Sequence, residues 1–138
     1  MEPLQPNYQQ TLSIMNAFEL QMEEARKNME IRERISDDTA HKYVGAVRDG
    51  LLAVRDEMRS GSGNSPFSVW YHVDESNTPA YERRFDYADD FSGGVAVVKD
   101  SSGYYHIYPD GREVYPDRIF YMDRSRLRVL LEKAMEIA

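Results

Sequence analysis

The first apolar pattern along the chain repeats every seven residues. Between Tyr8 and about Arg34, two sets of positions alternate along one seam: Tyr8, Met15, Met22 and Met29 in one set, Thr11, Phe18 and Ala25 in the other. A seven-residue apolar repeat is typical of an α-helix that packs against another helix. We therefore predict a helix over this range, with an oligomer interface made by Met15, Phe18, Met22 and Met29.

A second apolar stripe runs from about Asp38 to Arg59, with steps of three or four residues. It contains Ala40, Tyr43, Val44, Val47, Leu51, Val54 and Met58. This spacing is that of one face of a helix. Gly45 and Gly50 would each cost about 1 kcal/mol there relative to alanine. The stripe nevertheless predicts a second helix, which completes an antiparallel helical hairpin over residues 1–59.

The pattern changes after this stripe. Residues 60–66 are rich in glycine and serine, which predicts a flexible linker and a domain boundary. Residues 67–122 alternate between apolar and polar positions and are interrupted by turn sequences such as Pro109-Asp110-Gly111, which is typical of antiparallel hairpins. Residues 123–138 return to helical spacing. The predicted fold class is α+β: a helical hairpin, a small antiparallel sheet of repeated hairpins and a C-terminal capping helix.

The β region also contains an internal repeat. Placing residues 70–88 over residues 104–122, an offset of 34 without a gap, aligns several identical residues: Tyr71 with Tyr105, His72 with His106, Tyr81 with Tyr115, Arg84 with Arg118 and Tyr87 with Tyr121. Such self-similarity indicates that one structural unit is used twice. The offset fails upstream, because it places Phe91 and Gly94 on Glu57 and Ser60.

A family pattern can be compared with the second copy. Phe91, Gly94, Ala96 and Val98 form F-x-x-G-x-A-x-V, followed by Tyr104-Tyr105-His106-Ile107 and the Asp110-Gly111 turn. This arrangement resembles the WG-type β-repeat of bacterial proteins, with Tyr105-His106 in the place of its glycine region. The resemblance covers residues 67–122, about one and a half units. It implies a β-hairpin repeat used for binding, and it brings no catalytic residues.

Composition narrows the classes of function. The chain has 17 basic and 24 acidic residues, a net charge of −7, and no strongly basic segment. Duplex DNA is therefore not the expected partner, because phosphate neutralisation supplies most of such affinity. The absence of cysteine excludes disulfides and thiolate chemistry. Without a signal-like start or an apolar span, we expect a soluble, cytoplasmic protein with no membrane partner.

Candidate chemistry is concentrated in the repeat. His72 and His106 could form a paired site, but a zinc site needs further ligands at fixed geometry. A structural histidine used twice is the alternative. The aromatic side chains could stack on a ligand or stabilise the sheet across strands. A small anionic ligand could be held by a set of eight side chains: Tyr71, His72, Arg84, Tyr105, His106, Arg118, Arg124 and Arg128.

Three functions remain open at this point. The first is a non-enzymatic protein–protein interaction module, a homo-oligomer (with a homodimer as the simplest form) through the N-terminal helix. The second is a small-ligand protein that sequesters, for example, a nucleotide signal. The third is a metal-dependent enzyme that uses His72 and His106. The sequence favours the first, because no phosphate loop, nucleophile elbow or acid–base pair is present. It indicates no cofactor and no metal.

Overall fold

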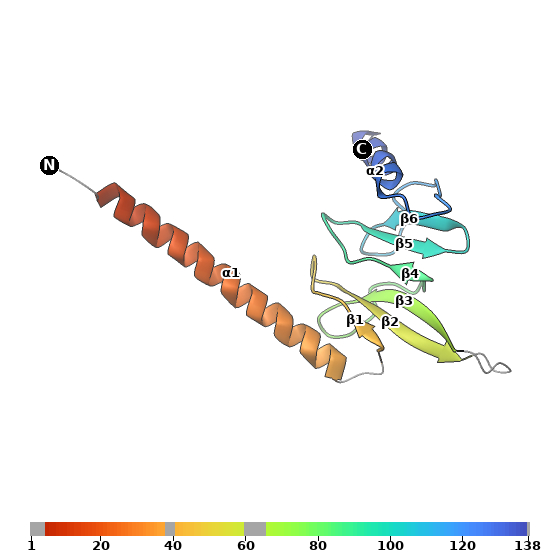
Figure 1. Ribbon diagram of the computed structural model, residues 1–138, viewed down its shortest axis with the longest axis horizontal. Helices are drawn as coiled ribbons and strands as arrows, with labels where there is room; N and C mark the ends of the chain where they lie inside the picture. Colours follow the sequence, from red (N-terminus) through yellow and green to blue (C-terminus); the bar gives the residue numbers. More distant parts are fainter. Residues whose placement is uncertain (1–4, 38–40, 60–65, 138) are drawn as a thin grey trace.

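The computed structural model describes residues 5–37, 41–59 and 66–137. Its elements follow in the order α1 Gln5–Asp37, β1 Tyr43–Val44, β2 Leu52–Arg59, β3 Pro66–Val73, β4 Tyr87–Ala88, β5 Ala96–Asp100, β6 Gly103–Ile107 and α2 Arg124–Ile137. The strands form two antiparallel sheets, β1-β2-β3 and β4-β5-β6 (Figure 1). The predicted α+β class, with a helix near each end of the chain, is confirmed.

The predicted second helix, residues 38–59, is wrong, because its described part contains β1 and β2. Between these strands Asp49 and Gly50 have φ angles of 53° and 76°. Positive φ lies outside the helical region and belongs to turns. Arg48 and Leu51 exchange two backbone hydrogen bonds of 2.9 Å across this turn. The predicted helical hairpin is therefore absent from the described residues, and α1 packs on a β unit instead.

The apolar stripe of residues 38–59 led to the wrong prediction of a helix for a physical reason. Leu52, Ala53 and Val54 are all buried at the start of β2, so this strand has no polar face there. A short continuous apolar run fits a buried strand and a helix equally well. Gly45 and Gly50 were the better indication that this segment is not a helix. Gly45 lies where an added Cβ would come within 2.5 Å of Asp90 Oδ1, and Gly50 needs its positive φ.

The glycine- and serine-rich stretch does not separate two domains. Residues 60–65 lie outside the described residues, but the strands on either side of them are partners. β2 and β3 are each eight residues long and pair along their whole length, with Leu52 opposite Val73. The boundary predicted at residues 60–66 is therefore wrong, because the chain on both sides belongs to one sheet.

The two sheets are copies of one three-stranded unit, which we name unit 1 (residues 43–85) and unit 2 (residues 87–119). The central strands have the same partners: Val54 pairs with Val44 and Tyr71, and Val98 pairs with Ala88 and Tyr105. The offset between the copies is 44 residues in the first two strands and 34 in the third. The difference of ten residues lies in the β2–β3 hairpin: β2 and β3 are each three residues longer than β5 and β6, and six residues connect them where two connect β5 and β6.

This change of offset explains why the sequence yielded only one and a half units. With an offset of 44, Phe91 and Gly94 fall on Val47 and Gly50, not on Glu57 and Ser60. Val47 and Phe91 are both buried, and Gly50 and Gly94 both have positive φ. The predicted half unit is therefore a complete one.

The units join end to end and share one core. Trp70 of β3 and Phe85 exchange two backbone hydrogen bonds of 2.8 Å, which lead the chain into unit 2. Buried residues from both units form a continuous cluster that includes Val54, Tyr71, Phe85, Val98 and Tyr105. The far end of unit 2 is covered by α2, which therefore occupies the place where a third unit would begin (Figure 1).

Helix α2 is fixed at its start and along one face. The Asp123 carboxylate accepts a 3.1 Å hydrogen bond from the Arg126 backbone N–H, which caps the helix. Leu127 is buried against Val97 and Ile119 of unit 2. The C-terminal capping helix is thus confirmed.

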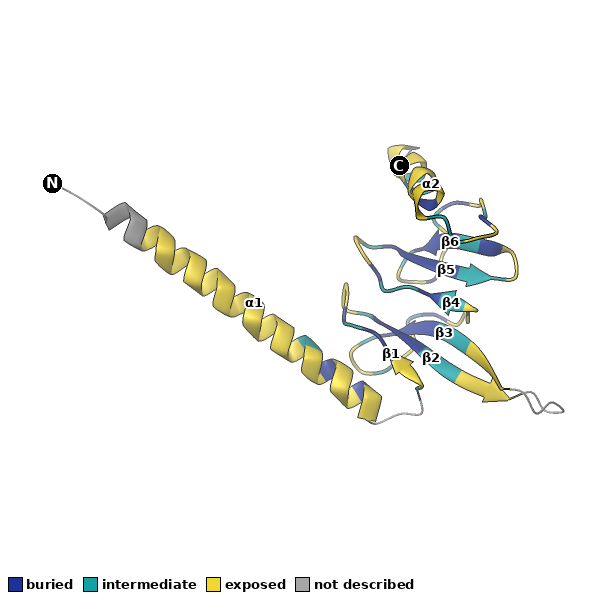
Figure 2. Ribbon diagram, viewed as in Figure 1, coloured by how far each residue is buried: buried dark blue, intermediate teal, exposed yellow. Residues whose placement is uncertain are grey.

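Helix α1 projects away from the rest of the molecule (Figures 1 and 2). Of the α1 residues whose burial the structure describes, only Ile31 and Ile35 near the end of the helix are buried. Arg32 and Arg34 fasten the same end, because they donate hydrogen bonds to the carbonyls of Val44 (2.9 Å) and Glu75 (2.6 Å). The described residues before this end are almost all exposed, so most of α1 has no support from the β units.

Candidate functional site

Tyrosine–arginine pairs are formed in both units by residues of the predicted ligand set. The Arg84 guanidinium lies 3.8 Å from the centre of the Tyr71 ring, and the Tyr71 hydroxyl donates a 2.6 Å hydrogen bond to Asp56. The same arrangement occurs in unit 2 with Arg118, Tyr105 and Asp100, at 3.6 Å and 2.6 Å. Burial and the carboxylate partner raise the pKa of both tyrosines to about 12. Each pair joins a strand tyrosine to an arginine in the segment that follows the strand, within the same unit.

His72 has a structural role. It is fully buried, its Nε2 donates to the carbonyl of Asp89 at 2.8 Å, and its Nδ1 is 2.5 Å from the Tyr81 hydroxyl. Because a carbonyl can only accept, Nε2 carries the proton and Nδ1 accepts from the tyrosine. Burial lowers the pKa of His72 to about 4. Both ring nitrogens are therefore used, and none is available to a ligand.

His106 differs from His72 at one nitrogen. Its Nδ1 lies 2.7 Å from the Tyr115 hydroxyl, as in unit 1. Its Nε2 has no hydrogen-bond partner within the described part of the chain, because the chain after unit 2 forms α2 instead of another strand. The residue is only 7% exposed and lines a pocket. Burial lowers its pKa from the ordinary value.

The α2 pocket lies between the face of unit 2 and α2 and has a volume of about 500 Å³. Arg124 and Arg128 of α2 line it together with His106, so three of the eight predicted ligand residues meet here. Arg124 forms a 3.1 Å ion pair with Asp89. The other five predicted residues, Tyr71, His72, Arg84, Tyr105 and Arg118, do not line the α2 pocket.

Sequence reasoning missed the acidic side of the α2 pocket. Asp90 lines it, and burial raises the pKa of this carboxyl, with Arg48 acting in the opposite direction. In the sequence Asp90 belongs to the acidic pair Asp89-Asp90, which matches no calcium loop. Its placement between the units was the missing information, and Gly45, which leaves room for the carboxylate, was the one available signal.

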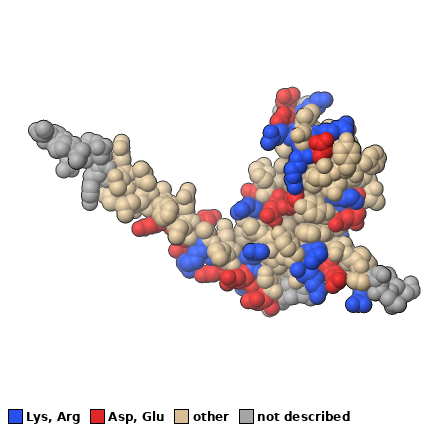
Figure 3. Space-filling model, viewed as in Figure 1, with Lys and Arg blue, Asp and Glu red and all other residues tan. Residues whose placement is uncertain are grey.

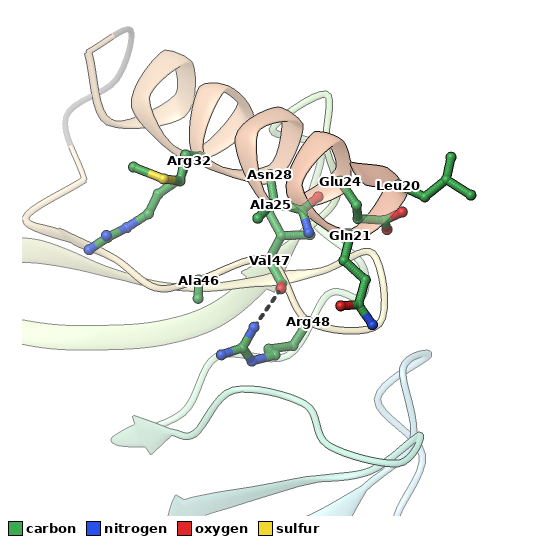
Figure 4. A pocket seen from close by; sticks show the side chains of 10 residues that line it. Leu20, Gln21, Glu24, Ala25, Asn28, Arg32, Ala46, Val47 and Arg48 are labelled. Carbon is green, nitrogen blue, oxygen red and sulfur yellow. Dashed lines mark hydrogen bonds between the residues drawn. The ribbon is translucent and has the colours of Figure 1, made fainter. Parts of the chain in front are cut away.

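A second hollow, the α1 groove, lies where α1 meets the connection between β1 and β2 (Figure 4). Its volume is about 530 Å³. Figure 4 shows Gln21, Ala25 and Asn28 of α1 above Val47 and Arg48. Met29 of the apolar seam also lines it. The predicted interface residues Met15, Phe18, Met22 and Met29 are all exposed, so they are available to another chain.

The histidine-based metal hypothesis gains no geometric support. Among the described residues, no group of three or more histidine, cysteine, aspartate or glutamate side chains is placed to hold a metal ion. Each repeat histidine is bonded to its own tyrosine instead. Within the same residues, neither helix has the length and hydropathy needed to cross a bilayer.

Comparisons of the chain with protein-family models, with curated proteins and with solved structures each find no match.

Proposed function

We propose that this chain is a non-enzymatic protein–protein interaction module of the WG-repeat type, and that a second copy of the chain binds along α1. The observation that carries the proposal is the exposed apolar seam. Met15, Phe18, Met22 and Met29 are 53%, 59%, 58% and 62% exposed. Large apolar side chains gathered on one surface mark interaction sites.

The length of the unsupported helix favours the proposal. α1 has 33 residues, which corresponds to about 50 Å at 1.5 Å per residue. Most helical stability in proteins comes from packing of an apolar face, not from intrinsic propensity. Here the only ion pairs along α1 among the described residues join Arg26 to Glu23 and Glu30. A helix this long therefore needs a surface to pack against.

The distribution of charge favours the first half of α1 as the centre of that surface. Residues 5–18 contain no charged side chain, and the acidic and basic residues begin at Glu19. Figure 3 shows the described part of this stretch as uncharged surface, with charges only nearer the β units. The centre of an interface is depleted of charged residues in the same way.

A second copy fits this surface because the seam keeps a strict seven-residue period. A straight helix drifts relative to that period, and two helices that both carry it coil around each other so that their seams stay in contact. The seam is thus matched to another helix of the same period, and α1 of another copy supplies one. The α1 groove beside Met29 extends the apolar surface toward the β units.

The test is light scattering coupled to size exclusion, applied to the full chain and to a Phe18→Lys/Met22→Lys variant. For a chain of 16.0 kDa we expect the wild type at twice this mass or a higher multiple, and the variant at 16.0 kDa. The variant should retain the circular dichroism of the β units, because neither side chain packs on them.

The matched control is Ser13→Lys/Asn16→Lys, which adds the same charge to another face of α1. Phe18 is five residues from Ser13 and two from Asn16, so at 3.6 residues per turn the control positions point away from the seam. This control should remain an oligomer. A wild type that stays monomeric at every concentration, or a control that dissociates as readily as the seam variant, would show that α1 is not the interface.

A further inference from the structure

The α2 pocket contains three polar groups that no described residue satisfies. These are His106 Nε2, the Arg128 guanidinium and the Asp90 carboxylate, none of which has a hydrogen bond or an ion pair in the described chain. The first is a neutral donor, the second a cation and the third an anion. His106 is largely buried, Asp90 is half-buried and Arg128 is exposed. Polar groups without a protein partner that converge on one pocket mark a place where a ligand can bind.

The His106 imidazole is fixed for this role. The His106 residue is only 7% exposed, and the Tyr115 hydroxyl is hydrogen-bonded to its Nδ1. In unit 1 the equivalent Nε2 of His72 donates to the carbonyl of Asp89. The same tautomer in unit 2 leaves the Nε2–H of His106 as a donor toward the pocket. An acceptor atom of a ligand would therefore replace the carbonyl that unit 2 lacks.

The other two charged residues that line the pocket, Asp89 and Arg124, neutralise each other. Asp89 accepts hydrogen bonds from the Tyr87 hydroxyl and from Arg124, the latter at 3.1 Å. Arg124 is thereby occupied as well. Arg128 and Asp90 form no ion pair with the other residues that line the pocket, and their signs are opposite, although Arg48 and Arg32 lie near enough to Asp90 to lower its pKa.

The rest of the lining is apolar. Val97, Leu127 and Leu131 contribute hydrocarbon surface beside the polar groups. A pocket with an apolar wall and a few convergent polar groups is the usual form of a small-molecule site. A volume of about 500 Å³ is ample for one small organic molecule.

We propose that the α2 pocket binds a small zwitterion of the amino-acid class. Its carboxylate would lie against Arg128 and His106 Nε2, its ammonium group against Asp90, and its apolar side chain against Val97, Leu127 and Leu131. Guanidinium is the side-chain group best matched to a carboxylate. Burial raises the pKa of Asp90, and an ammonium group beside it would favour the charged carboxylate again. This site is separate from α1 and does not depend on the proposed oligomer.

The test compares three probes that differ only in their charged groups: L-phenylalanine, 3-phenylpropanoate, which lacks the amine, and phenethylamine, which lacks the carboxylate. Each is titrated into the full-length protein and followed by the NMR signals of the backbone amides and of the His106 ring. We expect saturable shifts at His106 and at the start of α2 with phenylalanine. Loss of either charged group should weaken binding about tenfold, the usual effect of one charged hydrogen bond.

Two variants test which charged group of the ligand contacts Arg128 and which contacts Asp90. Arg128→Gln should weaken phenylalanine and 3-phenylpropanoate alike, whereas Asp90→Asn should weaken phenylalanine and leave 3-phenylpropanoate unchanged. Lys133→Gln, an exposed position on the same helix with the same change of charge, is the control and should alter neither. Equal binding of phenylalanine and 3-phenylpropanoate would overturn the zwitterion in favour of a plain anion site. Absence of saturable shifts with all three probes would overturn the site itself.

Discussion

Units 1 and 2 place the same residues in the same strands but end differently. Unit 1 is followed by another unit, and the backbone of that unit satisfies His72 Nε2. Unit 2 is followed by α2, whose side chains lie over the sheet without replacing that carbonyl. The same histidine–tyrosine pair is therefore part of the core in one copy and part of a pocket wall in the other.

In a repeat, the position of a unit decides the role of its residues. Each unit supplies the partners of the preceding one, so the last unit is incomplete by construction. A helix can cover its apolar surface, as Leu127 does here. A helix cannot supply backbone carbonyls from its middle, because these are used within the helix. Ligand-binding capacity at the end of the array follows from this difference.

The largest expected effect separates the two histidines. His72→Ala should lower the free energy of unfolding by about 4 kcal/mol, because it creates a cavity and leaves the Tyr81 hydroxyl and the Asp89 carbonyl unpaired. His106→Ala removes one hydrogen bond and should cost about 2 kcal/mol. Urea unfolding measures both. If His72→Ala does not fold, His72→Gln replaces it, and equal costs at the two positions would remove the distinction between the units.

The second prediction concerns pH. The pKa of His72 is about 4 in the folded protein against 6.5 for the ordinary side chain. The unfolded chain therefore takes up a proton first as the pH falls, so stability declines from pH 6.5 downward until the folded pKa is reached. The loss from this group is about 3 kcal/mol. Other groups also titrate in this range, so the test compares wild type with His72→Gln, which should show a shallower loss between pH 6.5 and 4.

NMR titration of the two histidines tests the low pKa of His72 directly. The two histidines can be followed separately by NMR, and His72 should stay neutral to lower pH than His106, because its ring is fully buried and has both nitrogens bonded. A His72 ring that takes up its proton near pH 6.5 in the folded protein would contradict the assignment of a buried neutral imidazole.

Much of unit 2 could be predicted from the sequence because its signals are local. The Gly93-Gly94 turn, the short β5–β6 connection and the Asp110-Gly111 turn all lie within a few residues of the strands they join. The equivalence of His72 and His106 could also be predicted from the sequence, since their surroundings are repeated with a constant offset of 34. Local turn chemistry and a constant offset are properties that a single sequence displays.

Unit 1 and the α2 pocket could not be predicted for the opposite reason. The extra ten residues of the β2–β3 hairpin changed the offset, so Val47 and Gly50 were not aligned with their equivalents. The pocket joins Asp90, His106 and Arg128, which meet only because α2 folds back over the sheet. No spacing in the chain encodes that contact.

The third prediction uses glycines to test the equivalence of the units. Gly50 and Gly94 hold the same turn with φ of 76° and 87°, and an added Cβ would meet nothing within 4 Å. Alanine at either position should cost about 1 kcal/mol from backbone strain alone. Gly111→Ala should cost about 2 kcal/mol, because the new Cβ would also lie 2.9 Å from Tyr81 of unit 1. Thermal unfolding of the three variants measures these costs.

The most informative outcome would be a difference between the stability costs of Gly50→Ala and Gly94→Ala. A large cost for Gly94→Ala and none for Gly50→Ala would mean that the β1–β2 turn of unit 1 differs from its counterpart. The assignment of two complete units would then fail at its first strands, although the third strands would still match.

The smallest expected effect separates the two arginine–tyrosine pairs. Both guanidinium groups lie over a tyrosine ring, but the Arg84 residue is exposed, whereas the side chain of Arg118 is only 20% exposed and also forms a 2.7 Å ion pair with Glu113. Cation–π contacts strengthen as they lose water, so Arg84→Gln should cost about 0.5 kcal/mol and Arg118→Gln about 1.5 kcal/mol. High salt should reduce the difference by screening the ion pair with Glu113. A difference that salt leaves unchanged would assign it to ring contact alone.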